Sequence, residues 1–377
     1  MSTVYRADHC GSLIRPEKLR RARADYVHGG ISHEQLKEAE DAAIRDAFIL
    51  QKEAGLDVFS DGEFRRGFWL SAISDEFFEG MENEGIDYVR YPFLKGKSIE
   101  QAELLVPPNP IVKGKLRRKK RITDSEIAFL RGESPGPFKI TIPSPVTLSR
   151  ASYKSGVSEK AYPTWEEFFE DYAKLVADEI RDIVKDGVKY VQLDAPHYTR
   201  FMVPERRSQL TSLGIDLQNE LNAAISAENA CLEAAKVDGV TRAIHICLGT
   251  FILGPQGPLG GAGNYDAEIT ERLIAELDAD VFLVEYSDRV SSLESLRGVA
   301  KGKVISLGIL NVRDPRVETE DEILRKVETA AKYVPVESLS LCPNCGFSGG
   351  AADAFVTEDI QKRKLAVLGR VADKVWN

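Results

Sequence analysis

Short apolar runs alternate with long amphipathic stretches along this chain. The apolar runs are rich in β-branched and aromatic residues, as buried strands are; they are Tyr5–Leu13, Asp57–Phe64, Phe138–Ser144, Tyr190–Pro196, Arg242–Leu248, Val281–Ser287, Lys303–Leu310 and Ser338–Cys345. Other stretches repeat apolar residues at helical spacing; they are His33–Ala54, Trp165–Asp186, Asp216–Val237, Ala267–Leu277, Thr319–Tyr333 and Glu358–Trp376. The pattern predicts a chain in which strands and helices alternate.

Strands that alternate with helices form a parallel sheet, and eight such units in one chain predict a closed (β/α)8 barrel. An open, doubly wound sheet is the alternative, but no Gly-x-Gly-x-x-Gly turn follows an early strand. We therefore expect an α/β fold in which residues 1–377 form a single TIM-barrel domain. The stretch of about residues 71–135 is predicted to be an insertion between the second and third strands.

Nearly every predicted strand finishes in a polar residue that can take part in chemistry. These residues are Ser12, Glu63, Ser144, Asp194, His245 with Cys247, Glu285 and Cys345. A barrel gathers the C-terminal ends of its strands at one mouth, whereas an open sheet would spread them along a line. The strand ends thus favour the barrel and predict one site at its mouth.

The predicted insertion contains a basic run, Lys113–Arg121, whose beginning suggests a turn or hairpin. An insertion that follows a strand lies on the active-site side of a barrel, so this run could reach an anionic part of a substrate. A solvated, charged hairpin is the alternative, and it is the usual role of a charge run.

Composition narrows the class of protein. The chain has 377 residues, 43% of them hydrophobic, and a formal net charge of −9 with a pI of about 5.4. Such an acidic protein is not expected to bind nucleic acid or an anionic membrane. No apolar run has transmembrane length, and the first residues lack the apolar core of a signal peptide, so a cytoplasmic location is expected.

Two sulfur-bearing motifs each close an apolar run: His245-Ile-Cys247 and Cys342-Pro-Asn-Cys345. Residues i and i+2 of a strand point to the same face, so His245 and Cys247 project together, as two ligands of one metal ion must. Thiolate and imidazole ligands suit zinc best among the common metals. The five cysteines of the chain are too few and too odd in number for a disulfide framework.

The second motif leaves alternatives open. A Cys-x-x-Cys can be a redox pair, but this one precedes Gly-Phe-Ser-Gly-Gly rather than a helix start that would lower the pKa of a thiol. If Cys342 and Cys345 both bound zinc, the site would be closed and purely structural. We favour Cys345 as the ligand because it lies nearer the C-terminal end of its strand, with Cys342 packing beside the site. The fourth position then falls to Glu285, water or substrate.

Three carboxylates, Glu63, Asp194 and Glu285, also end apolar runs. Each of them alone could be a salt-bridge partner or a helix cap. Together at one mouth they would hold the ammonium group of a substrate. Ser12 could donate a hydrogen bond to a substrate carboxylate, or it could shape a turn.

These motifs occur in the order found in a known family. The chain resembles the cobalamin-independent methionine synthases, specifically their catalytic C-terminal barrel and the short stand-alone proteins related to it. The matching segments are Asp8–Leu13, Asp61–Arg66, Ser144–Thr147, Gln192–Pro196, His245–Cys247, Glu285, Asp314–Val317 and Pro343–Gly346. They cover essentially the whole chain, and the separate N-terminal barrel of the full-length enzymes is absent from this sequence.

The resemblance implies a zinc ion with four protein ligands, namely His245, Cys247, Glu285 and Cys345, of which the glutamate exchanges for the substrate thiolate. It also implies a site for the amino-acid part of homocysteine, formed by Ser12, Glu63 and Asp194. Zinc would stabilise the thiolate, which is the nucleophile that attacks an electrophilic carbon.

Two departures from the family pattern concern the alkyl donor. The methionine synthases usually carry a glutamate after the aspartate at 194, where this chain has Ala195 and then, after the proline, His197. They also carry a histidine, thought to pass a proton to the methyl donor, where this chain has Arg313. The expected catalytic residues are therefore His197, Arg313 and Asp194. Methyl-tetrahydrofolate, methylcobalamin and an epoxide all stay open as donors.

We expect a zinc-dependent thiol alkyltransferase whose partners are a small thiol and an alkyl donor, with methyl transfer to homocysteine as the first candidate reaction. An epoxyalkane:coenzyme M transferase is the nearest alternative, and its sulfonate thiol would need arginines such as Arg65, Arg66 or Arg313. A further alternative is the related barrel that decarboxylates uroporphyrinogen without a metal, but that function would give His245 and Cys247 no role. A non-catalytic, zinc-stabilised binding barrel would require the closed Cys3His site. The sequence leaves the oligomeric state open.

Overall fold

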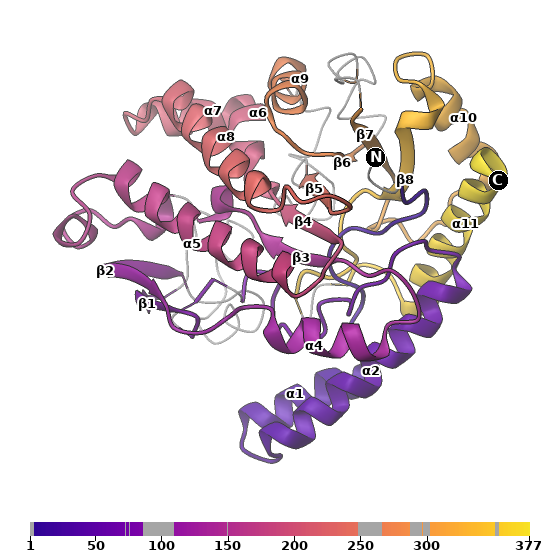
Figure 1. The fold of residues 1–377 in the computed structure, drawn as a ribbon, viewed down its shortest axis with the longest axis horizontal. Helices are drawn as coiled ribbons and strands as arrows, with labels where there is room; N and C mark the ends of the chain where they lie inside the picture. The colour runs from indigo at the N-terminus through magenta and orange to yellow at the C-terminus, as the bar shows by residue number, and fades with distance from the viewer. Residues whose placement is uncertain are drawn as a thin grey trace.

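The computed structural model describes residues 4–71, 73, 74, 76–85, 109–148, 150–247, 266–286, 296, 302–350 and 354–377. At its centre lies a parallel sheet of six strands that are neighbours in chain order. The strands are β3 (Ile140–Pro143), β4 (Tyr190–Asp194), β5 (Thr241–Ile246), β6 (Val281–Glu285), β7 (Val304–Leu310) and β8 (Leu339–Pro343). Helices connect the strands and lie outside them, as connections between parallel strands require (Figure 1).

Two short extended segments close this sheet into a ring. The segment at Ala7 pairs in parallel with Leu341 of β8, and the segment at Phe59 pairs in parallel with Phe138, just before β3. The two segments are joined by a hydrogen bond of 2.9 Å from the Asp57 amide to the Ala7 carbonyl. The six strands and two segments make eight positions, so the predicted (β/α)8 barrel is confirmed.

The first two predicted strands are wrong in extent. In the described part of the chain, Tyr5–Leu13 and Asp57–Phe64 each keep one ladder pair and form no continuous strand. The chain turns at Gly11, where φ is 51°, and again at Gly62 and Glu63, where φ is 66° and 60°. Glu63 is the only non-glycine residue with a positive φ among the residues described, and such a backbone costs about 1–3 kcal/mol.

The predicted helices are confirmed to within a few residues. They are α2 (His33–Glu53), α5 (Trp165–Lys185), α8 (Leu217–Ala234), α9 (Ala267–Glu276), α10 (Glu320–Ala330) and α11 (Glu358–Trp376). Capping side chains explain where they start, because Ser32 and Thr319 form capping boxes and Asp216 accepts two backbone N–H bonds. Within the described ranges, no helix is both long enough and apolar enough to cross a membrane.

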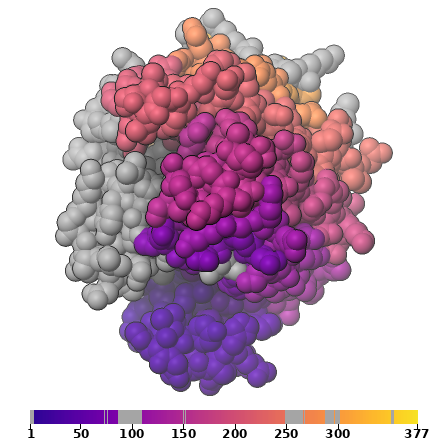
Figure 2. All heavy atoms as spheres, turned by 90° about the vertical axis from the view of Figure 1, so that its left-hand side faces the viewer, coloured from indigo at the N-terminus to yellow at the C-terminus, as the bar shows by residue number. Residues whose placement is uncertain are grey.

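Further helices were not predicted: α1 (Glu17–Val27), α4 (Asp124–Glu133), α6 (Thr199–Met202) and α7 (Pro204–Ser212). Helix α1 is mostly charged and buries only Leu19, so it has no apolar repeat to detect. It packs along α2, where Arg23 pairs with Glu40 at 2.8 Å. The two helices form the indigo projection at the base of the molecule in Figure 2.

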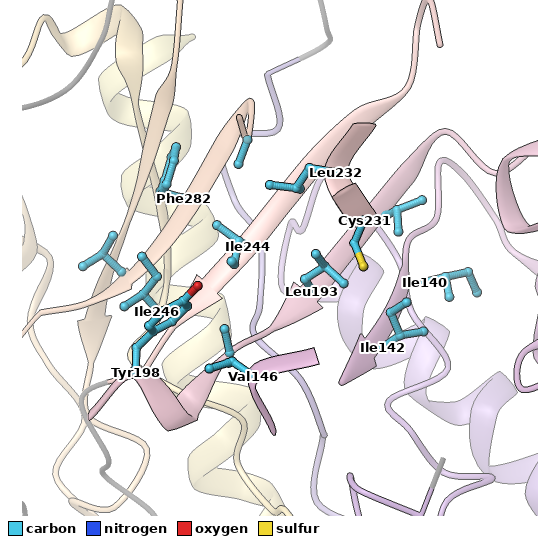
Figure 3. Close-up of a cluster of buried hydrophobic side chains, with 14 of the residues drawn as sticks. Ile140, Ile142, Val146, Leu193, Tyr198, Cys231, Leu232, Ile244, Ile246 and Phe282 are labelled. Carbon is cyan, nitrogen blue, oxygen red and sulfur yellow. The ribbon is translucent and has the colours of Figure 1, made fainter. Parts of the chain in front are cut away.

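Side chains along each barrel strand alternate between the interior of the ring and the helices outside it. In β5, Ile244 and Ile246 belong to the large core that also contains residues of α8 (Figure 3). Ala243 belongs instead to a smaller buried cluster inside the ring, which includes Tyr190, Leu283 and Cys342. His245, two residues after Ala243, therefore faces inward as well.

A buried ion pair lies inside the ring. The Lys139 ammonium donates to the Asp8 carboxylate at 2.7 Å and to the Gln192 side chain at 2.8 Å. The Tyr190 hydroxyl donates to the other oxygen of Asp8 at 2.8 Å. Burying a charge is costly without such partners, so this network ties the N-terminal segment to the start of β3 and to β4.

The basic run lies largely in β2 (Pro110–Arg118), which pairs antiparallel with β1 (Phe78–Asn83). Lys113 pairs with a carboxylate of β1 at 2.7 Å. Arg118 pairs with Glu179 of α5 at 2.8 Å. These local ion pairs favour the charged-hairpin alternative over a role in reaching the substrate.

Glu228 of α8 is buried and accepts a hydrogen bond of 3.2 Å from the Val146 amide, in the turn after β3. Burial raises the pKa of Glu228 to about 7, although hydrogen bonds from Ser144 and Val146 oppose the shift. The folded state thus holds this proton more tightly than the unfolded state, whose value is 4.5. Glu228 therefore lowers the stability of the fold as pH rises between these two values, by at most about 3 kcal/mol, and the loss stays level at higher pH.

Replacing Glu228 by Gln should remove this pH-dependent loss, because the amide stays neutral and can still accept from Val146. Urea unfolding of the parent and of Glu228→Gln, at about pH 5 and about pH 8, should show a larger gain for the variant at the higher pH. Glu233→Gln, on the exposed face of the same helix, is the matched control. An equal gain at both pH values would contradict a titrating, buried Glu228.

Candidate functional site

Strand β5 brings the first sulfur-bearing motif to the mouth of the barrel. In the parallel register, His245 lies opposite Asp194 of β4 and Leu283 of β6. Cys247 follows β5 immediately, and Glu285 is the last residue of β6. Because all the strands run the same way, these residues share one rim of the barrel.

The ligand atoms of His245, Cys247 and Cys345 lie within 4.8 Å of one another. The two sulfur atoms are 3.9 Å apart, and Cys247 Sγ is 3.3 Å from Oε2 of Glu285. No other compact group of His, Cys, Asp or Glu residues of this kind occurs in the part of the chain that the structure describes. Residues 98 positions apart thus form one nitrogen- and sulfur-rich group with a carboxylate at its edge.

A hydrogen bond fixes the ring orientation of the histidine in this group. Its Nδ1 lies 3.0 Å from the Leu283 carbonyl oxygen, which can only accept, so Nδ1 carries the proton. The other ring nitrogen, Nε2, is buried without an oxygen or nitrogen partner among the described residues, and the Cys247 thiol is its neighbour. An imidazole that is held at Nδ1 and lies beside two sulfur atoms fits a metal ion that prefers thiolate and imidazole ligands.

The crowding of the group also affects its ionisation. The neighbouring Cys345 thiol, together with burial, raises the pKa of Cys247 well above its usual value. Burial lowers the pKa of His245, but Cys247, Asp194 and Cys342 together outweigh burial, and the pKa rises to about 9. A cation bound between these side chains would reverse both shifts, because it stabilises a thiolate and competes with the proton for the imidazole nitrogen.

Cys342 is placed differently from Cys345. It lies in β8 opposite Gly308 of β7, fully buried, with its Sγ 3.6 Å from the Ser306 carbonyl oxygen. Cys345 lies two residues beyond the end of β8 and is only partly buried. Cys342 therefore packs inside the ring, whereas Cys345 belongs to the compact group.

Ser12 and Glu63 meet in the turns that follow the first two barrel positions. The Ser12 hydroxyl donates to one oxygen of the Glu63 carboxylate. The other oxygen accepts from the Thr141 hydroxyl at 3.0 Å and lies 3.5 Å from the Arg66 guanidinium. Arg15 donates to the Glu63 carbonyl at 3.1 Å, which helps to hold the left-handed backbone. These contacts make a rigid, buried cluster around a strained residue, a combination typical of functional sites.

Asp194 ends β4 and faces the same mouth. Gln192 donates to its carboxylate at 2.7 Å and accepts from Lys139, so the interior network reaches the site. Burial raises the pKa of Asp194 to about 6; the Glu63 charge adds to this shift, and His245 opposes it. The side of the mouth that holds Asp194 and Glu63 is therefore acidic.

The other two residues predicted to be catalytic have aromatic neighbours. His197 lies in the short turn after β4 and stacks on Trp69, with ring centres 6.3 Å apart. Arg313 follows β7 and places its guanidinium over the Phe355 ring at 4.5 Å. Their catalytic roles stay predictions.

Sequence reasoning missed three residues around the site. Asn344, inside the Cys-x-x-Cys motif, donates to Glu285 at 3.1 Å; Gln192 orients Asp194; and Trp69 covers His197. Strand alternation could have predicted that Gln192 lies on the same face as Asp194, because the two residues are two positions apart in one strand. Asn344 lies in a segment that matches the family, but local spacing cannot predict the contacts of Asn344 or Trp69, because their partners lie far away along the chain.

Comparison with known proteins shows which family the chain matches. The family described as the catalytic domain of cobalamin-independent synthases matches residues 7–360. The protein YxjH of Bacillus subtilis (strain 168) is 30% identical over 376 residues, which cover 99% of this chain and 95% of the relative. A methionine synthase of Saccharolobus solfataricus is 25% identical over 342 residues, which cover 89% of this chain and 86% of the relative.

Solved structures share the fold over the full length. A protein from Listeria monocytogenes superposes with a TM-score of 0.75 at 24% identity, covering 100% of this chain and 99% of its own. A B12-independent methionine synthase from Shewanella sp. W3-18-1 gives a TM-score of 0.72 at 21% identity, with coverage of 99% and 98%. Because the family match spans nearly the whole chain, this protein belongs to the catalytic-domain family of the cobalamin-independent synthases.

Proposed function

We propose that this protein is a zinc-dependent thiol alkyltransferase that transfers a methyl group to homocysteine and gives methionine. The observation that carries the proposal is the compact group of His245, Cys247 and Cys345, with two sulfur atoms and an Nε2 that lacks an oxygen or nitrogen partner among the described residues. Zinc is the common metal that suits this donor set best. When bound, it would stabilise the substrate thiolate, which is the nucleophile of the reaction.

The position of Glu285 supports an exchangeable fourth ligand. Its carboxylate lies beside Cys247 but outside the group of three. From there it can serve the metal when no thiol is present and withdraw when a thiol takes its place. Cys342 packs inside the ring, which favours this open arrangement over the closed Cys3His site of a structural zinc.

The acidic side of the mouth supports an amino-acid thiol. Asp194 and Glu63 would attract a substrate ammonium group, and Ser12 lies against Glu63. A molecule with a thiol at one end and an ammonium group at the other would satisfy the sulfur-rich side and the acidic side together. The relative named as a methionine synthase supports methionine as the product, and homocysteine is the amino-acid thiol that gives methionine when it is methylated.

Two of the three arginines that could bind a sulfonate thiol, Arg65 and Arg66, are already engaged with carboxylates. Arg66 lies 3.5 Å from Glu63 and 3.1 Å from Glu126, and Arg65 pairs with Asp41 at 2.5 Å. Recruiting Arg66 to a sulfonate would take a charged partner away from the buried carboxylates of Glu63 and Glu126. These pairs weigh against coenzyme M as the thiol.

For the alkyl donor we propose the surface formed by His197 and Trp69. Their stacked rings give a flat aromatic face, and His197 follows Asp194 closely in the turn after β4. A ring nitrogen of His197 can hold and pass a proton, which a nitrogen leaving group such as a folate requires. Arg313 would supply a positive charge for an anionic part of the donor.

The first prediction of this proposal concerns the metal. The parent protein should hold about one zinc ion per chain, and His245→Ala, Cys247→Ser and Cys345→Ser should each lose it or bind it far more weakly, because a site without one of its strong ligands is poor. Elemental analysis with chelator competition measures this. Cys342→Ser is the matched control and should retain its zinc. If Cys342→Ser empties the site while Cys345→Ser does not, the assignment is reversed.

The second prediction concerns recognition of the ammonium group. Replacing Asp194 by Asn removes a charge-assisted hydrogen bond worth roughly 1.5–3 kcal/mol, so the Kd for homocysteine should rise roughly ten- to a hundredfold. Calorimetric titration of the zinc-loaded protein measures this change. A homocysteine analogue without its amino group should bind the parent weakly and lose little more in the variant. Equal binding of that analogue, or of coenzyme M, by the parent would reject homocysteine as the substrate.

The third prediction follows from the raised pKa of Asp194, which lies near 6. Only the ionised carboxylate attracts an ammonium group, so the contribution of Asp194 should be complete well above that pH and should fade below it. The ratio of homocysteine Kd between Asp194→Asn and the parent isolates this effect from the ionisation of the thiol. A ratio that stays constant down to about pH 5 would contradict the role of Asp194.

A further inference from the structure

The side chain of Asn344 joins the ends of three barrel strands. It follows β8, and its backbone N–H donates to the Leu310 carbonyl at the end of β7 at 2.9 Å. Its Oδ1 accepts from the Val312 amide at 3.1 Å, and its Nδ2 donates to Oε1 of Glu285, at the end of β6, at 3.1 Å. Both ends of this buried amide are therefore used.

The orientation of the amide follows from its partners. A backbone N–H can only donate, so the carbonyl oxygen of the side chain must face Val312. The NH2 group is then left to face Glu285, where a carboxylate oxygen can accept from it. Asn344 thus presents a fixed donor to one oxygen of Glu285.

A glycine in the next strand permits this close approach. A Cβ on Gly308 would lie 2.7 Å from the Val284 carbonyl oxygen, 2.9 Å from the Asn344 Cα and 3.1 Å from the Glu285 Cα. These atoms belong to backbone and could not move aside cheaply. The strand ends are therefore packed so that Asn344 lies directly against Glu285.

The two oxygens of Glu285 have different surroundings. Oε1 is held by Asn344, whereas Oε2 lies 3.3 Å from Cys247 Sγ, on the side of the metal-binding group. We propose that Asn344 is a positioning residue that reserves Oε1, so that Glu285 can offer the zinc only Oε2. This inference rests on the proposed function, in which Glu285 gives way to a substrate thiol.

Holding one oxygen of Glu285 would affect how easily a substrate thiol displaces this glutamate from the metal. A carboxylate can bind a metal through one oxygen or through both, and release from both is harder because two bonds must break. A hydrogen bond from outside the ligand set that occupies one oxygen keeps the ligand singly bound and fixes its direction. Asn344 would thus make Glu285 a ligand that is present without substrate and yet easily displaced.

The test compares the zinc-loaded parent with Asn344→Ala, and with Asn344→Leu, which preserves volume if the alanine variant is unstable. X-ray absorption at the zinc edge of the thiol-free proteins should show one carboxylate oxygen in the parent and a second one in either variant. The Kd for homocysteine should rise about tenfold in the variants, the scale of a lost hydrogen bond to a charged group. Asn311→Ala, which removes an exposed asparagine after β7, is the matched control and should change neither readout.

A double-mutant cycle separates positioning from a general structural role. In a Glu285→Ala background, Asn344→Ala should change the homocysteine Kd by less than about twofold, because its partner is gone. An unchanged oxygen shell with an unchanged Kd would overturn the inference, and so would an equal loss of thiol affinity in the Glu285→Ala background. If the parent holds zinc but binds no thiol, the proposed function is rejected. The number of carboxylate oxygens bound to the zinc would still test the role of Asn344. A parent that takes up no zinc would overturn both.

Discussion

The whole site depends on one geometric constraint. In a closed ring of parallel strands, alternate side chains point inward, and the register between neighbouring strands sets which of them meet. In β5 the inward residues are Ala243, which packs the interior, and then His245, which joins Cys247 and Cys345 in one compact group. In β4 and β6 the row of inward-facing side chains likewise ends in a carboxylate, Asp194 in β4 and Glu285 in β6. In each of these strands, the first inward-facing side chains fill the interior of the ring, and the last one carries a polar group to the mouth.

Buried charges connect this packing to the site. Lys139 is held by Asp8 and Gln192 inside the ring, and Gln192 in turn holds Asp194 at the mouth. Such pairs do little for stability, because desolvation offsets much of their attraction, but removing one partner is costly. Their main effect is to fix orientation. The interior network thus fixes the orientation of the Asp194 carboxylate, in addition to the position that β4 gives it.

The mouth of the barrel has two sides of different chemistry. Sulfur and imidazole come from β5 and from the chain beyond β8, while carboxylates and hydroxyls come from the turns at Ser12 and Glu63 and from β4. The division follows from the order of the barrel positions, since neighbouring strands place their ends side by side. The two sides therefore offer different kinds of polar groups to one opening.

Local spacing along the chain was enough to predict six of the helices, six of the barrel strands and the shared direction of His245 and Cys247, because apolar periodicity, capping residues and strand alternation act over a few residues. It did not predict where the first two strands stop, since the positive φ of Glu63 is held by contacts such as the one from Arg15. It also missed the bond from Asn344 to Glu285. These contacts join residues that are 48 and 59 positions apart, and only closure of the ring brings them within hydrogen-bonding distance.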